Sequence, residues 1–183
     1  MEPSDLIFAL AGEQNRKEFA VKLLSEGLAP RLLLSVARFE VRRFRQLALP
    51  FQLHLPEMAA KLSPAERHFF VFVENGCASV WTIPKARFGT LREILALRAW
   101  LNEHPEITSV LVVSSGFHLR RVRMCCQSLL PTCVRLAFLR SSSGVKWWED
   151  RRFSRNVCAE LGKVPFYALV LPFVKLKLGM TTE

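Results

Sequence analysis

The stretch VLVVSSGFHLRRVRMCC, residues 110–126, decides the fold. It opens with four apolar, mostly β-branched residues and passes through the small residues Ser114–Gly116 into a pattern typical of a helix. A buried parallel strand that leads through small residues into a helix N-terminus is the anion-binding corner of α/β proteins. His118 and Arg121 lie three residues apart, so they share one helical face beside this corner. We therefore expect the functional site here.

The first 35 residues have the pattern of a strand–helix–strand unit. Leu6–Leu10 is a continuous apolar run, as in a strand buried in a parallel sheet. A tight turn at Gly12 follows, then an amphipathic helix from about Asn15 to Gly27 and a second strand over Arg31–Ser35. The turn at Gly12 is thus the carboxyl end of a second buried strand.

Further along the chain, strand patterns continue to alternate with helical ones. Asn75-Gly76 lies between two β-rich runs and predicts a hairpin around residues 69–83. We predict a single domain, residues 1–183, in the α/β class: a Rossmann-like, doubly wound, mostly parallel sheet with helices on both faces and the hairpin added. Residues of about 40–78 look like an insertion. The other predicted elements are a short basic helix over Arg38–Arg45, helices over Thr90–Leu101 and Trp147–Leu161, and a strand over Val134–Leu139.

Charge and composition narrow the class of protein. Lys and Arg outnumber Asp and Glu by 26 to 16 in 183 residues, a net charge of +10, while half of the residues are hydrophobic. Such a chain folds, and its excess charge favours anionic partners: phosphates, an anionic membrane surface or, with less support, nucleic acid. A solvated basic surface without a partner is the alternative. Neither the net charge nor the hydrophobic fraction predicts the oligomeric state.

The sequence shows none of the patterns typical of a disulfide framework, a metal site or a targeting segment. The five cysteines show no CxxC spacing and mostly lie among apolar residues, as expected of reduced thiols in a cytoplasmic protein. The four histidines are scattered, so we predict no metal site. Neither a signal peptide nor an apolar run of spanning length is visible, which predicts a cytoplasmic location. No complete GxGxxG motif is present, so no cofactor is predicted with certainty.

The apolar tail, Val164–Leu178, contains Pro165 and Pro172. It is too short to span a bilayer, and prolines interrupt helices. Lys175 and Lys177 alternate with apolar residues, a period that suits an extended segment. We expect residues 167–171 to pack on the sheet and the lysine-bearing end to lie extended over the body. An interfacial anchor is the alternative, and it requires a helix.

Hydroxyl and basic groups dominate the predicted site. Ser114 and Ser115 can donate hydroxyl groups to an anion, or they can cap the helix. His118 lies near the positive end of a helix, which favours a neutral imidazole that acts as a general base or as a hydrogen-bond donor, and it is our catalytic candidate. Arg121 can hold a carboxylate or phosphate through two hydrogen bonds. His118 packed beside capping serines is the bland alternative.

Two further cations belong to the same predicted edge of the sheet. Arg16 lies one turn into the helix after Gly12 and could reach over a bound anion, although a plain surface arginine would have the same spacing. Lys85 follows the strand that ends at Ile83. We expect both to contribute to a cationic rim.

The first stretch also resembles a known family. It is similar to the V-T-S-x-x-H-x-x-R signature of the YdcF/SanA/ElyC-like family, a bacterial domain family of unknown function. Val113, Ser114, Ser115, His118 and Arg121 stand at the matching positions.

The resemblance extends beyond this motif. Arg16 and Gly27 match the family's first helix, and Thr90 matches the Thr of its N-T-x-E-N motif. It implies the strand order 3-2-1-4-5, in which the Gly12 and Ser114 loops adjoin. The basic and hydroxyl groups of the predicted crevice indicate a phosphate-bearing or nucleotide-like small molecule as ligand. Since family members are associated with the cell envelope, an envelope precursor is one implied substrate class.

The departures from the family pattern bear on catalysis. Gly89 stands in place of the motif's Asn, and Arg92 in place of its Glu. Without these groups, acid/base or metal-assisted chemistry is disfavoured, and the remaining basic and hydroxyl groups suit anion binding. A transferase or hydrolase acting on an anionic substrate stays open. The rival hypothesis is a non-catalytic interaction module that docks on an anionic membrane surface or nucleic acid through a basic face.

Overall fold

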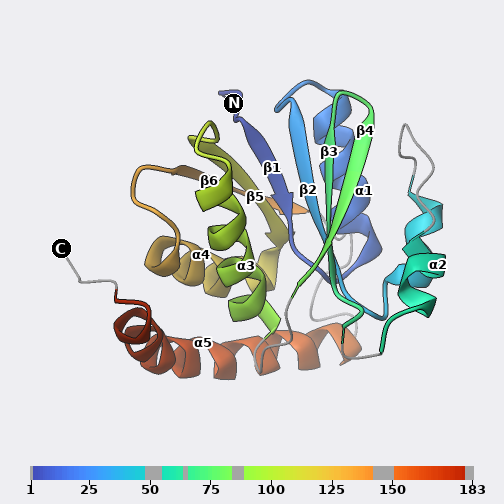
Figure 1. Ribbon diagram of the computed structural model, residues 1–183. Helices are drawn as coiled ribbons and strands as arrows, with labels where there is room; N and C mark the ends of the chain where they lie inside the picture. The colour runs from blue at the N-terminus through green and yellow to red at the C-terminus, as the bar shows by residue number, and fades with distance from the viewer. Residues whose placement is uncertain (1, 48–54, 64–65, 84–88, 142–150, 180–183) are drawn as a thin grey trace.

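The computed structural model describes residues 2–47, 55–63, 66–83, 89–141 and 151–179. Strands and helices alternate along most of this length (Figure 1). The strands are β1 (Leu6–Ala9), β2 (Arg31–Val36), β3 (Phe69–Glu74), β4 (Cys77–Thr82), β5 (Ser109–Ser115) and β6 (Arg135–Ser141). The helices are α1 (Gln14–Ser25), the 3-10 helix η1 (Val41–Gln46), α2 (Leu55–Ala60), α3 (Gly89–Glu103), α4 (Gly116–Leu129) and α5 (Arg151–Lys177).

The strands form one mixed sheet in the order β4-β3-β2-β1-β5-β6. Strands β2, β1, β5 and β6 are parallel, whereas β3 runs antiparallel to β2 and β4 antiparallel to β3. The α/β class is therefore confirmed, and the hairpin predicted around residues 69–83 is present. Its turn uses Asn75 and Gly76, both with positive φ, as two-residue hairpin turns require.

The sheet is less parallel than predicted, and its order differs from 3-2-1-4-5. The end of β2 pairs with the start of β3, Val36 with Phe69. The connection between these strands therefore starts and ends at the same edge of the sheet, so β3 must run back antiparallel. The hairpin consequently forms one side of the sheet, and only the side around β1 and β5 has the parallel arrangement.

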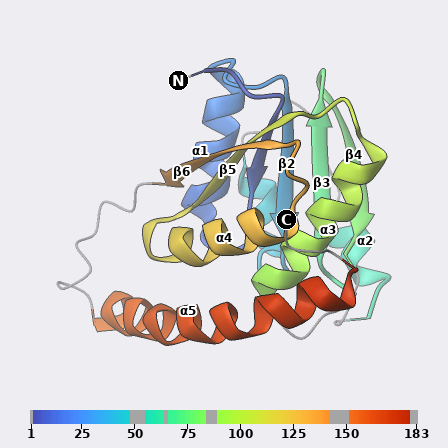
Figure 2. The ribbon, with the colours of Figure 1, turned by 90° about the vertical axis from the view of Figure 1, so that its left-hand side faces the viewer.

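Helices cover both faces of the sheet, as predicted (Figures 1 and 2). Because side chains alternate along a strand, Leu6 and Phe8 of β1 point to one face and Ile7 to the other. The first face carries buried residues of α3 and α4, among them Ile94 and Val122. The second face carries buried residues of α1, η1 and α2: Ala20, Leu23, Val41, Phe44, Leu55 and Ala59.

The C-terminal segment is one helix, which corrects the prediction of an extended tail. Figures 1 and 2 show α5 running along the edge at which the parallel strands end. Tyr167 and Leu171, one turn apart, are buried in the core beside α3 and α4. Pro165 and Pro172 lie inside the helix, each removing one backbone N–H from its ladder. The burial of one face of α5 outweighs the loss of these hydrogen bonds. The prediction of an extended segment was wrong because, over the five residues 174–178, alternating apolar and polar residues fit a helix as well as a strand.

Candidate functional site

Two loops predicted to form the site lie together at the carboxyl ends of β1 and β5. The two strands are adjacent and parallel, with Ala9 opposite Val113. The chain after β1 turns at Gly12 into α1, and the chain after β5 passes directly into α4 at Gly116. Two helix N-termini therefore converge here. Neither N-cap side chain, that of Glu13 or that of Ser115, caps its helix by a hydrogen bond.

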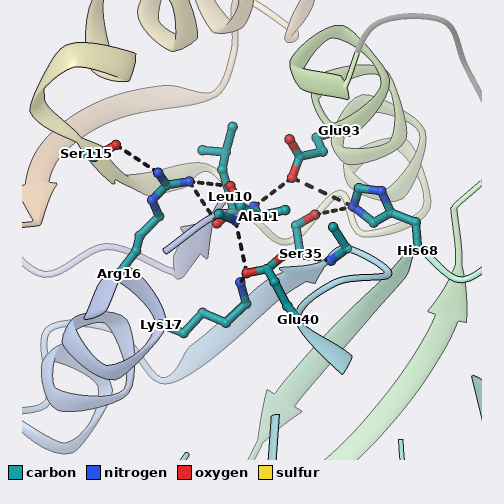
Figure 3. A network of polar contacts seen from close by, with 11 residues as sticks. Leu10, Ala11, Arg16, Lys17, Ser35, Glu40, His68, Glu93 and Ser115 are labelled. Atoms are coloured by element: carbon teal, nitrogen blue, oxygen red, sulfur yellow. Dashed lines mark hydrogen bonds and ion pairs between the residues drawn. The ribbon is translucent and has the colours of Figure 1, made fainter. Parts of the chain in front are cut away.

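Arg16 joins the two loops from within. Its side chain is only 2 % exposed. The guanidinium donates hydrogen bonds to the carbonyl oxygens of Leu10 (3.1 Å) and Ala11 and to Oγ of Ser115 (2.9 Å), as Figure 3 shows. Its Nε has no hydrogen-bond partner, and no carboxylate among the described residues forms an ion pair with it. Arg16 is therefore a buried cation held by neutral oxygens, not the surface arginine that the sequence left open.

The guanidinium of Arg16 explains the glycine at position 12. A Cβ atom on Gly12 would lie 2.9 Å from Nη1 of Arg16, closer than such contacts occur. Gly12 also has a φ of +144°, a conformation that side chains disfavour. The turn therefore needs glycine for both reasons.

Two buried carboxylates fix the same turn (Figure 3). Glu93 on α3 accepts a hydrogen bond from the backbone N–H of Ala11 (2.7 Å), and Glu40 accepts one from Gly12 (3.0 Å). These two N–H groups are therefore occupied and are not open to a ligand. Burial raises the pKa of Glu93, although the nearby Ser35 hydroxyl, the Ala11 N–H and the charge of Arg16 act against it.

Sequence reasoning missed both carboxylates. It expected the loss of acidic groups, because Arg92 stands where the resemblance predicts Glu. The structure places Glu93, one residue further on, on the buried face of α3 beside Ile94. An acidic residue among the core positions of a helix was the available signal. For Glu40, which lies after β2, the sequence offers no comparable signal.

The network extends to β2 and β3 through a buried histidine. Nε2 of His68 lies 2.8 Å from Oγ of Ser35 and 3.8 Å from Oε1 of Glu93. All three side chains are buried, so they support the turn and do not face a ligand.

A second cluster links α4 to α5. The Glu160 carboxylate lies 3.1 Å from Arg121 and 3.2 Å from Nδ1 of His118, and it accepts a hydrogen bond from Lys163 (2.8 Å). Arg121 also stacks over the ring of Tyr167, 5.1 Å from its centroid. Burial raises the pKa of Glu160, but the hydrogen bonds and positive charges around it outweigh burial and lower the pKa to about 2. Glu160 is thus a carboxylate.

Nδ1 of His118 faces a hydrogen-bond donor and a hydrogen-bond acceptor at once. Nη2 of Arg121 lies 2.6 Å from its Nδ1. A guanidinium only donates hydrogen bonds and a carboxylate only accepts them, so Nδ1 is an acceptor toward Arg121 when the ring proton is on Nε2 and a donor toward Glu160 (3.2 Å) when the proton is on Nδ1. Burial lowers the pKa of His118, helped by the charges of Arg16 and Arg121, and these effects outweigh the opposing influence of Glu160. The ring is therefore neutral, with one nitrogen as a donor and the other as an acceptor.

A cavity of about 470 Å³ opens between these elements. Of the predicted site residues, it brings together Gly12, Arg16 and His118. Its other lining residues were not predicted: Glu13, Phe39, Arg43, Phe117, Ala159, Glu160 and Lys163. The α5 residues could not be found from sequence, because their position depends on how that helix crosses the sheet edge.

The remaining predicted residues lie behind the cavity or outside the described chain. Ser114 and Ser115 are fully buried, and the Ser115 hydroxyl accepts from Arg16. Arg121 is buried and positions His118 and Glu160. Thr90, in the first turn of α3, is buried and hydrogen-bonds with Tyr167. Lys85 lies outside the described residues.

No group of three or more His, Cys, Asp or Glu side chains suited to a metal ion occurs within the described ranges. Comparisons with protein-family models, curated proteins and solved structures give no match to this chain.

Proposed function

We propose that the protein binds a phosphate-bearing or nucleotide-like small molecule in the cavity at the carboxyl ends of β1 and β5. The observation that carries this proposal is Arg16, a buried guanidinium that lines the cavity without a carboxylate partner among the described residues. A buried charge whose hydrogen bonds go only to neutral oxygens is costly. The charges of Glu93, Glu40 and Glu13 offset this cost only in part, since burial still lowers the pKa of Arg16. An anion in the cavity would offset that cost.

The other groups around the cavity favour the same ligand. Arg43 and Lys163 add positive charge, and His118 adds a neutral imidazole. The N-termini of α1 and α4 meet at the cavity without side-chain caps, and the free N–H groups and dipole of a helix N-terminus attract anions. Glu160 is neutralised by Arg121 and Lys163, so it does not cancel this field.

Two aromatic side chains support a ligand that is larger than inorganic phosphate. Phe39 and Phe117 both line the cavity, and an aromatic face can stack on a planar ring such as a nucleobase. The volume also falls within the range of about 300–1,000 Å³ typical of small-molecule sites. The resemblance to the YdcF/SanA/ElyC-like family and its Rossmann-like arrangement is consistent with this proposal.

Binding of inorganic phosphate, pyrophosphate and nucleoside monophosphates, followed by calorimetry and thermal unfolding, tests the proposal. A ligand at about one hundred times its dissociation constant should stabilise the protein by roughly 2.7 kcal/mol. Arg43→Gln should weaken binding roughly tenfold, because it removes a charged hydrogen bond. Arg42→Gln is the matched control, since Arg42 is a neighbouring exposed arginine of η1 that does not line the cavity.

Arg43 is preferred to Arg16 for this test because Arg16 also holds the two loops together. Absence of any thermal shift or heat with all three ligand classes would overturn the proposal. Equal losses in Arg42→Gln and Arg43→Gln would also overturn it, since they would indicate binding to the basic surface of η1 at large.

A further inference from the structure

The second half of α5 exposes a stripe of large apolar side chains. Phe166, Leu169, Phe173 and Leu176 are spaced by three, four and three residues, so they lie on one face of the helix. Leu169, Phe173 and Leu176 are 71 %, 68 % and 79 % exposed. We call these four residues the α5 stripe.

The α5 stripe is separate from the face that holds the helix to the protein. Tyr167 and Leu171 are buried, and Val174 packs against them in the same core cluster. These positions follow each other at the four- and three-residue spacing of a second helical face. Because α5 packs on the core through this second face, the α5 stripe does not contribute to holding the helix in place. Single exposed apolar residues are ordinary, but several in register on one helix mark a contact surface.

The charges around the α5 stripe identify the partner. Between Leu161 and Gly179 the sequence contains three lysines, Lys163, Lys175 and Lys177, and no acidic residue. The whole chain carries a net charge of +10. An apolar helical face accompanied by lysines alone is typical of helices that lie in the interface of an anionic membrane.

A second copy of the chain suits this surface less well. If two stripes packed against each other, neither helix would offer an acidic residue between Leu161 and Gly179 to Lys175 and Lys177 of the other. Like charges placed opposite each other disfavour such a pair. Lipid phosphate groups, in contrast, complement Lys175 and Lys177.

We propose that the α5 stripe seats the protein on the surface of an anionic lipid bilayer. The helix lies in the plane of the membrane, with Leu169, Phe173 and Leu176 in the boundary between headgroups and acyl chains and with Lys175 and Lys177 among the lipid phosphates. No described helix is long and apolar enough to cross a bilayer. This inference uses the outer face of α5 and does not depend on a ligand in the cavity.

Co-sedimentation with vesicles tests the proposal. The full chain should bind phosphatidylcholine vesicles that contain roughly one-third phosphatidylglycerol, and bind phosphatidylcholine alone much more weakly, with the difference reduced by high salt. Leu169→Gln/Phe173→Gln should weaken binding to anionic vesicles at least roughly tenfold, because two apolar side chains no longer leave water. Glutamine keeps a good helix propensity.

Controls separate this surface from general stickiness and charge. Met58→Gln changes an exposed apolar residue on α2 and should bind as the parent chain does. Lys175→Gln/Lys177→Gln should weaken binding to anionic vesicles, whereas Lys22→Gln/Lys61→Gln should leave it near the parent value. Equal binding of parent and Leu169→Gln/Phe173→Gln overturns the proposal. A parent protein that ignores vesicles but sediments as a dimer, and becomes monomeric in that variant, overturns it in favour of a second copy.

Discussion

Lys17 and Glu40 form an ion pair in which both side chains are buried, 1 % and 6 % exposed. The Glu40 carboxylate also accepts hydrogen bonds from the backbone N–H groups of Gly12 (3.0 Å) and Ala37 (2.8 Å). One side chain thus ties α1, the turn after β1 and the chain after β2 to each other. The cavity wall rests on this arrangement, because Gly12 belongs to it.

Removal of one partner of this pair should destabilise the fold strongly. Lys17→Met leaves the Glu40 carboxylate buried without its cation, and we expect the free energy of unfolding to fall by about 3–5 kcal/mol. The double variant Lys17→Met/Glu40→Gln should lose less than the sum of the two single variants, since neither charge is then left alone. Urea unfolding of all four proteins measures this coupling.

An exposed pair provides the control. Lys22 and Glu26 are 3.7 Å apart on the surface of α1, and Lys22→Gln should change the free energy of unfolding by less than about 0.5 kcal/mol. Additive effects in the Lys17 and Glu40 cycle would contradict the coupling.

Gly12→Ala should cost more than a glycine replacement at another position of positive φ. The new methyl group would lie 2.9 Å from Nη1 of Arg16, so the guanidinium must move out of its three hydrogen bonds. Gly27 also has a positive φ, +75°, but nothing lies within 4 Å of the position that a Cβ atom would take there. Gly27→Ala therefore reports a backbone cost alone, on the order of 1 kcal/mol. At Gly12 the φ of +144° adds a larger backbone cost to the contact with Arg16.

Thermal unfolding compares the two glycine variants. Gly12→Ala should lie well below Gly27→Ala in melting temperature, and it should also weaken any phosphate binding. Equal melting temperatures would mean that Arg16 yields without cost, contrary to its buried and hydrogen-bonded position.

The sequence predicted the central part of the fold because that part is encoded locally. Leu6–Leu10 and residues 110–113 are apolar runs of strand length, and each is followed by small residues and an amphipathic helix. The direction of β3 was not encoded in this way, since it depends on where the chain between β2 and β3 returns. The helical conformation of the C-terminal segment was not predicted, because it depends on the packing of Tyr167 and Leu171 against a core formed by residues distant in sequence.

The candidate site divides along the same line. Gly12, Arg16 and His118 follow directly after strands in the chain, so a pattern of strand, turn and helix places them at one edge. Glu93 and Glu160 reach this edge from helices distant in sequence, and their positions depend on long-range packing. Local patterns therefore indicated where the site lies and missed the carboxylates that order it.

The free energy of unfolding of Glu93→Gln, relative to that of the parent protein, should increase as pH rises. Burial raises the pKa of Glu93 above the 4.5 of an ordinary glutamic acid. Above pH 4.5 the folded protein therefore holds this proton more tightly than the unfolded chain, so stability is lost as pH rises through the folded pKa. Glutamine keeps an oxygen that accepts from Ala11 N–H and removes the titration.

The difference in unfolding free energy between Glu93→Gln and the parent, measured from acid to neutral pH, tests this sign. Glu103→Gln, at an exposed position on the same helix, controls for the loss of a carboxylate from the surface of α3. A Glu93→Gln variant that instead loses stability relative to the parent as pH rises would show that Glu93 is ionised and stabilised by Arg16.

His118 should make the fold less stable below its ordinary titration range. Its pKa in the folded protein is lowered from 6.5, first by burial and then by the charges of Arg16 and Arg121. Below pH 6.5 the unfolded chain binds a proton that the folded protein does not, so the stabilisation is complete above pH 6.5 and is lost as pH falls.

The variant His118→Gln tests this pH dependence, because glutamine keeps an acceptor for Arg121 and does not titrate. Between about pH 7.5 and 5.5 the parent should therefore lose more unfolding free energy than this variant.

The variant His104→Gln controls for the loss of an imidazole. His104 follows α3, is remote from Arg121 in sequence and packs on Trp100. The pH window separates His118 from its neighbour Glu160, whose pKa of about 2 confines its own loss of stability to the range below 4.5. If His118→Gln followed the parent in parallel from neutral to mildly acidic pH, burial would not hold the imidazole neutral, and the lowered pKa of His118 would be wrong.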